Sequence, residues 1–394
     1  MTSILLLLMV ATSAPELCGV CHPDTRVLFA QSIHSNEELT CTSCHGGNPK
    51  ADTVEGAHRG SFKGKIRRRE IPALCASCHS DGNLMRPYNL PTDQYALYQT
   101  SPHGRTLASG DDRAALCTDC HGVHGILEVE DPKSPVHSRN APATCAQCHS
   151  KPAMMKAFGW ETDPYALFMA GKHGEALLKR QDASAPGCAR CHGSHGAAPP
   201  GVGDVNKVCG QCHTAVRDRY LESPHREGLT AAGLPECSSC HGHHDIRRAE
   251  MKDLDKVCVT CHDTGSAEAD LGVKMQTLYA AAEADVEKGA GVIEEAKGVP
   301  LHVEDYEARL EEARTDLIEA ETAMHSLDLA QIERLTGRAR SIGNEVASEA
   351  HEKIEALTWR KVGLLVFWFY LIVTIMVLVR FRARAVRESA GSGA

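Results

Sequence analysis

The sequence predicts a mostly α-helical protein with much irregular structure: a motif-rich N-terminal domain, a three-helix neck and one C-terminal transmembrane helix. Nine copies of one motif, Cys-x-x-Cys-His, lie between residues 18 and 262. Apolar residues at helical spacing follow in residues 267–357, and an uncharged apolar run occupies residues 362–379. The 394 residues are enough for more than one domain.

The nine motifs use all 18 cysteines of the chain. Disulfide bonds give no reason for a histidine after every second cysteine, and structural zinc needs two ligand pairs per ion, which nine units cannot supply. Residues i, i+3 and i+4 of a helical turn share one face, so both cysteines and the histidine of a motif can meet one porphyrin. The motifs therefore predict nine covalently bound haems c.

The predicted attachment residues are Cys18, Cys21, Cys41, Cys44, Cys75, Cys78, Cys117, Cys120, Cys145, Cys148, Cys188, Cys191, Cys209, Cys212, Cys237, Cys240, Cys258 and Cys261. The predicted proximal iron ligands are His22, His45, His79, His121, His149, His192, His213, His241 and His262.

A two-haem module recurs within this domain. Its clearest copy joins SPHGRTLASGDDRAALCTDCHGVHG to CAQCH, and the copies that begin GKHGEALL and SPHREGLT have the same order. Each has a histidine 12 to 15 residues upstream, a CxxCHGxH segment and a second CxxCH. A looser copy begins at His34, and CGVCH stands alone. Such repetition predicts stacked modules and a chain of haems rather than one deep pocket.

Histidines outside the motifs are candidates for the sixth iron position. We expect most irons to have two histidine ligands, which leaves no open site and favours low potentials. His243 and its neighbour His244 are alternatives for one ligand position. His302 and His351 are expected to be exposed. His325 is either a surface residue or a ligand. The distal candidates are His34, His58, His103, His124, His137, His173, His195, His225 and His244.

The neck carries a heptad seam from Tyr306 through Leu310 and Leu317, and KGVP at 297–300 ends the helix before it. The chain has a net charge of −9, and its one basic cluster in the haem region, Lys63 to Arg69, is expected to neutralise haem propionates rather than bind nucleic acid.

The chain is expected to sit in a bacterial inner membrane as a single-pass protein. Arginines follow the apolar run, which places the C-terminus in the cytoplasm and the haems in the periplasm. The short apolar segment at the N-terminus suggests a signal peptide. The predicted segments are a signal peptide (1–14), a nonahaem domain (15–265), a helical neck (266–357), a transmembrane helix (358–380) and a basic tail (381–394).

The CxxCHGxH modules, neck and anchor together resemble the low-potential multihaem c-type cytochromes with doubled CxxCH motifs, including members that act beside membrane-bound b-type cytochromes. The resemblance implies an electron-transfer subunit, without catalytic residues of its own, between a quinone-linked b-type cytochrome and soluble periplasmic carriers. The alternative is a multihaem oxidoreductase acting on nitrite, hydroxylamine or tetrathionate. Such enzymes need an exposed iron, often marked by CxxCK, whereas all nine motifs here end in histidine. A structural or metal-storage role leaves the haem spacing unexplained.

Overall fold

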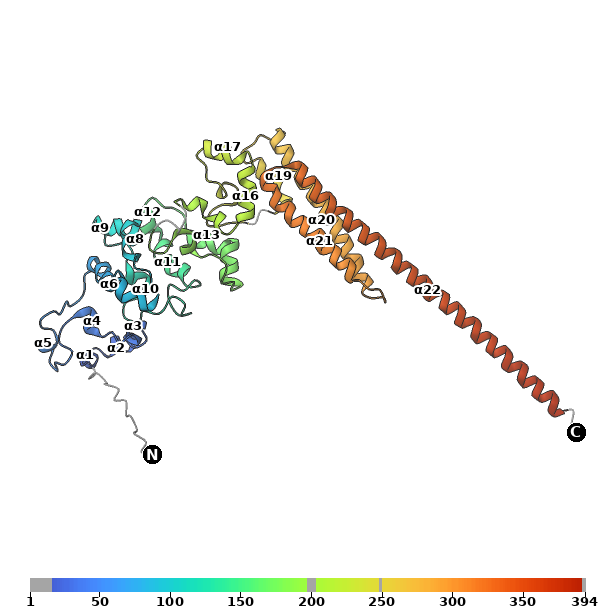
Figure 1. Cartoon of the computed structure of the whole chain (residues 1–394), viewed down its shortest axis with the longest axis horizontal. Coiled ribbons are helices and arrows are strands. Elements are labelled where there is room, and N and C mark those ends of the chain that lie inside the picture. Colours follow the sequence, from blue (N-terminus) through green and yellow to red (C-terminus); the bar gives the residue numbers. More distant parts are fainter. Residues whose placement is uncertain (1–15, 197–202, 248–249, 392–394) are drawn as a thin grey trace, which may run out of the picture. The chain divides into compact units, whose positions relative to one another are not determined.

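A computed structural model describes residues 16–196, 203–247 and 250–391 of the chain (Figure 1). These residues form helices and turns, without a strand among them. The predicted signal peptide lies outside the described residues. The chain divides into two compact units. The first comprises residues 1–212 and 235–248, and the second comprises residues 213–234 and 249–394. The division falls inside the predicted nonahaem domain rather than at residue 265.

Short helices dominate the first unit, and most of its CxxCH motifs form or end one of them. The motif helices are α1 (Cys18–Cys21), α4 (Cys41–His45), α6 (Ile71–His79), α10 (Cys117–His121), α11 (Ala141–His149), α15 (Cys188–His192), η4 (Val205–Gln211) and α18 (Ser238–His241). The helices between them are α2 (Pro23–Phe29), α3 (Ile33–Asn36), α5 (Val54–Ala57), η1 (Arg68–Glu70), α7 (Gly82–Met85), η2 (Arg86–Tyr88), α8 (Gln94–Thr100), α9 (Pro102–Ala108), α12 (Pro152–Lys156), α13 (Pro164–Ala170), α14 (Lys172–Gly174) and η3 (Glu175–Lys179).

The hydrophobic core of this unit is small. Leu107, Ala114 and Leu116 are buried together, with Ile71 and Tyr98 packed against them. Few apolar side chains are therefore available to hold so many short helices, and covalently attached porphyrins would supply the missing apolar filling.

The glycine that follows four of the motifs ends the motif helix. Gly46, Gly122, Gly193 and Gly242 have φ between 66° and 84° and ψ within about 30° of 180°. This combination is essentially restricted to glycine, because a Cβ atom would clash with the backbone. The CHG pattern therefore encodes an abrupt change of chain direction directly after the motif histidine.

The second unit combines haem-region helices with the neck. Its helices are α16 (Thr214–Glu222), α17 (His225–Ala231), η5 (Met251–Asp253), α19 (Leu254–Cys258), α20 (Ala267–Ala296), α21 (Glu304–Ala323), η6 (Met324–Ser326) and α22 (Leu329–Gly391). The hydroxyl of Ser266 caps α20 by accepting a hydrogen bond from the Ala269 N–H at 3.2 Å. Helix α20 ends at Ala296, directly before the KGVP segment.

Three helices, α20, α21 and α22, run alongside one another around one apolar core (Figure 1). Met275 and Val286 of α20, Leu310 of α21, and Ile332 and Val346 of α22 are all nearly inaccessible to solvent. The heptad positions therefore face inward, as an amphipathic helix requires. The same core also buries the Asp316 carboxylate, which pairs with Arg338.

The third neck helix continues without a break into the apolar run, so that α22 covers 63 residues. It is long and apolar enough to cross a membrane, and no residue in its most apolar segment is buried. Leu365 and Phe369 are 70% and 71% exposed. The segment is thus not buried in the core of this chain, and such exposure is what a lipid-facing segment requires.

Candidate haem-binding sites

Several motif histidines in the described part of the chain lie opposite a second histidine. The ring-centre separations are 6.4 Å for His22–His58, 6.0 Å for His79–His34, 6.2 Å for His45–His124, 6.1 Å for His149–His103, 6.2 Å for His121–His195, 5.9 Å for His192–His244 and 6.1 Å for His262–His225.

These separations fit an iron atom between the two rings. A metal–nitrogen bond of about 2 Å on each side, with roughly 1 Å from each nitrogen to its ring centre, gives a total of about 6 Å. By comparison, His58 stacks on Phe62 with ring centres 4.2 Å apart and planes 13° apart. The histidine pairs are wider than this stack and have the spacing of two ligands of one iron.

Apart from His22–His58, these pairs follow two rules of sequence register. The upstream histidine of a module faces the second motif of the same module, and the histidine of CHGxH faces the first motif of the preceding module. The first rule covers His34–His79, His103–His149 and His225–His262; the second covers His45–His124, His121–His195 and His192–His244. The glycine of CHG explains the second rule, because the turn it makes directs the following histidine away from its own motif.

Burial favours the neutral, iron-binding form of several of these rings. Loss of water lowers the pKa of His121, and the charge of His195 lowers it further. Burial likewise lowers the pKa of His34, His79 and His149. An imidazole must lose its second proton before it can bind a metal, so these surroundings suit ligation.

The remaining candidate histidines lie at the following positions. His173 lies in α14, at the same module position as His103. His137 accepts a hydrogen bond at Nδ1 from the Arg139 N–H, 3.4 Å away. His243 is exposed, with its ring 5.0 Å from that of His244. His302 and His351 are exposed on the neck, 3.9 Å from Glu304 and 3.5 Å from Glu355.

The cysteines of successive motifs lie next to one another in an alternating order. First cysteines lie next to one another at Cys18–Cys41, Cys75–Cys117, Cys145–Cys188 and Cys209–Cys237. In between, Cys44 lies near Cys78, Cys120 near Cys145 and Cys148, and Cys191 near Cys209 and Cys212. The attachment points of the first eight motifs therefore follow one another in space in sequence order.

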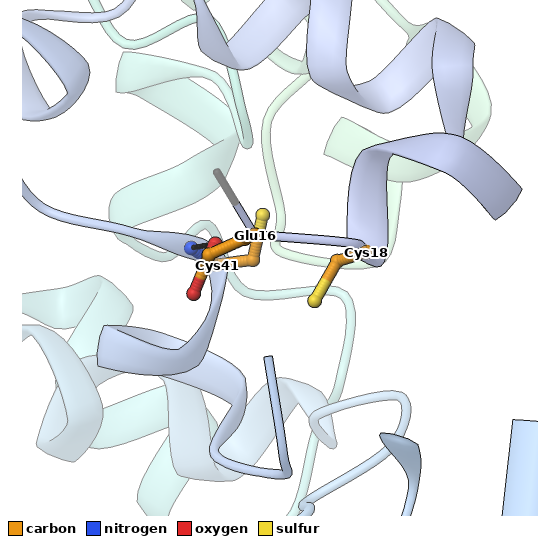
Figure 2. A group of neighbouring side chains, drawn as sticks. All are labelled: Glu16, Cys18 and Cys41. Carbon is orange, nitrogen blue, oxygen red and sulfur yellow. Dashed lines mark hydrogen bonds between the residues drawn. The ribbon is translucent and has the colours of Figure 1, made fainter. Parts of the chain in front are cut away.

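Glu16 joins Cys18 and Cys41 at the first of these junctions (Figure 2). Their ligand atoms lie within 4.8 Å of one another, as in a metal site, but both sulfur atoms belong to CxxCH motifs and are assigned to thioether bonds. The Glu16 carboxylate accepts hydrogen bonds from the Cys41 N–H at 2.8 Å and the Thr42 hydroxyl at 2.8 Å. Burial raises the pKa of Glu16, but these bonds outweigh it and lower the pKa below its usual value. Glu16 thus caps helix α4.

The basic cluster makes ion pairs within the chain. Arg68 binds Asp119 at 2.7 Å and donates to the carbonyl of Ala114, and Arg69 binds Asp112 at 2.7 Å. Asp119 lies inside the CTDCH motif and also accepts a hydrogen bond from the Leu116 N–H, 2.9 Å away. The arginines therefore hold a motif helix in place, a role that the sequence alone did not indicate.

Aromatic neighbours of the ligands were also missed. Phe62 stacks on His58, and Trp160 lies with its ring centre 5.9 Å from that of His149. Phe62 comes four residues after His58 in an irregular segment, so no periodic pattern marks it. The pairing rules were not marked in the sequence either, because the repeated register does not show which motif a given histidine faces.

Comparison with known proteins agrees with this chemistry. A family model described as cytochrome c3 matches residues 33–151. The multiheme cytochrome MtrA of Shewanella baltica (strain OS185) is 26% identical over 223 residues, covering 51% of this chain and 56% of that protein. The chain thus spans about half the length of this curated relative, and no solved structure gives a significant match. Taken with the nine motifs and the histidine pairs, these matches identify the chain as a multihaem c-type cytochrome.

Proposed function

We propose that the chain carries nine haems c, most of them with two histidine ligands, and relays electrons between a quinone-linked b-type cytochrome in the membrane and soluble periplasmic carriers. The observation that carries the relay is the unbroken series of cysteine neighbours from the first motif to the eighth. A cofactor array arranged in sequence order needs no moving part to pass charge along the chain.

The histidine pairs support a relay over an enzyme. When bound, the haems supply reversible one-electron chemistry at iron. The facing histidines would hold the iron between them: His121 and His195, for example, would both bind one iron. A site filled on both faces offers no position for nitrite, hydroxylamine or tetrathionate.

Helix α22 supports the placement at a membrane. Its exposed apolar segment would anchor the protein in the bacterial inner membrane, with the haem-bearing residues in the periplasm and the arginine-rich tail in the cytoplasm. Reporter fusions test this topology. A cytoplasmic reporter should be active after Gly391 and a periplasmic reporter after Thr264, and the reverse pattern contradicts the placement.

The relay is tested on the purified holoprotein. Mass spectrometry should find nine haems on the chain, and electron paramagnetic resonance of the oxidised protein should show low-spin signals that nitrite and hydroxylamine leave unchanged. The protein should also be reduced by quinol when membranes containing its b-type partner are present. A stoichiometric high-spin signal with steady turnover of a small substrate would instead establish the oxidoreductase.

A further inference from the structure

We propose that His325, in the turn between α21 and α22, is an axial ligand of a haem iron, so that the neck itself takes part in haem binding. This inference rests on the haem content of the proposed function and goes beyond it. It gives the neck, which contains no CxxCH motif, a direct role in cofactor binding.

The position of His325 brings it to the haem-bearing part of its unit. His325 is half-buried in η6, between the buried residues Met324 and Ser326. This short helix packs against α16, which begins directly after the motif histidine His213. The end of the neck that carries His325 therefore meets a segment that leaves a haem motif.

The hydrogen bond of its ring gives His325 the tautomer that binds iron. Nδ1 lies 3.3 Å from the carbonyl oxygen of Thr322. A carbonyl oxygen only accepts, so Nδ1 carries the proton and Nε2 of the neutral ring presents its lone pair. Metal-binding histidines commonly donate their second ring N–H to a backbone carbonyl in this way, which fixes both tautomer and orientation.

Two motif histidines show the same arrangement. Nδ1 of His45 lies 3.2 Å from the Gly64 carbonyl oxygen, and Nδ1 of His241 lies 3.4 Å from that of Arg247. His137 has the opposite arrangement, because its Nδ1 accepts from a backbone N–H and the proton of the neutral ring is then on Nε2. By this criterion, His325 resembles a proximal ligand more closely than His137 does.

The turn around His325 holds the ring in one direction. The Ser326 hydroxyl donates to the Ala323 carbonyl at 2.7 Å and accepts from the Asp328 N–H at 3.2 Å. Leu327 has a φ of +60°, a left-handed conformation that is uncommon for a bulky residue. Such strain persists where the surrounding structure requires a particular geometry, frequently at a ligand site.

The experiment uses the full holoprotein with His325→Ala and His325→Met, and with His351→Ala as the matched control on an exposed neck histidine. In His325→Ala, one haem equivalent should change from low to high spin in electron paramagnetic resonance and magnetic circular dichroism, and added imidazole should restore it. In His325→Met, one haem should remain low-spin with a histidine–methionine signature and a raised potential. His351→Ala should match the unmutated protein.

The inference is overturned if His325→Ala keeps every haem low-spin without added imidazole. Should the alanine variant fail to fold, His325→Met decides: an unchanged spectrum and redox titration reject the ligand role. These outcomes are separate from failure of the relay, which would show as high-spin haem or substrate turnover in the unmutated protein.

Discussion

His124 lies three residues after the motif histidine His121, yet its ring faces His45 of the preceding module, with ring centres 6.2 Å apart. His121 in turn faces His195 of the following module. If the facing histidines bind iron as proposed, each of these modules takes a ligand from its successor. The modules are then expected to assemble together rather than independently, because the first motif of each one needs a histidine of the next.

Replacing His124 should change the haem of CTSCH and leave that of CTDCH intact. In His124→Ala, one haem equivalent should become high-spin by electron paramagnetic resonance, because the iron bound by His45 loses its second ligand. The assignment is checked in double variants. In a protein lacking Cys41 and Cys44, the substitution should have no further effect on spin state; in one lacking Cys117 and Cys120, it should still convert one haem. The opposite result contradicts the crossed pairing.

Replacing the glycine after a motif should destabilise the haem region. Gly122 has φ 84° and ψ −179°, so Gly122→Ala places a Cβ in a region that costs on the order of 1–3 kcal/mol. We expect a lower melting temperature and a smaller yield of fully loaded protein. Gly82→Ala is the control, because Gly82 lies at ordinary φ with open space around its Cβ position. Equal melting temperatures for the two variants would argue against the strain.

The cap formed by Glu16 should contribute stability that depends on pH. Its pKa is lowered in the folded protein, so the contribution is present above the unfolded carboxyl pKa of about 4.3 and is lost as the pH falls through the lower folded value. Glu16→Gln should therefore cost up to about 1 kcal/mol at pH 7, and this difference should shrink below about pH 4. Denaturant titrations at several pH values measure it, with the exposed Glu55→Gln as control. A difference that persists or grows in acid is incompatible with this role.

The neck should lose more stability when the partner of its buried carboxylate is removed than when the carboxylate itself is removed. The Asp316 side chain is 0% exposed and accepts from Nε of Arg338 at 2.6 Å, whereas the Arg338 side chain is 57% exposed. Arg338→Ala removes the hydrogen-bond donors of this buried carboxylate and should lower the melting temperature of the neck. Asp316→Leu should cost less, because Arg338 can turn to water.

The exposed Arg334→Ala serves as the control for this pair and should change stability by less than about 0.5 kcal/mol. Thermal unfolding followed by far-ultraviolet circular dichroism of the holoprotein compares the three variants. If Arg338→Ala and Arg334→Ala melt together, the ion pair has no part in holding the neck.

The sequence by itself determined the chemistry of the cofactors and the local structure. Two cysteines and a histidine at fixed spacing are a property of one helical turn, and an uncharged apolar run is a property of one segment, so both can be read without knowledge of distant contacts. The seam through Leu310 and Leu317 could be predicted for the same reason, because the positions that face a core repeat with the period of the helix.

Only the tertiary structure decided which histidines face one another. His124 is adjacent in sequence to one motif and in space to another, because the left-handed turn at Gly122 reverses the direction of the chain after His121. The series of cysteine neighbours, the cap from Glu16 and the ring orientation of His325 likewise depend on contacts or hydrogen bonds that periodicity does not encode. A motif specifies the cysteines and the histidine that bind a haem. The packing of neighbouring modules specifies which second histidine faces that motif.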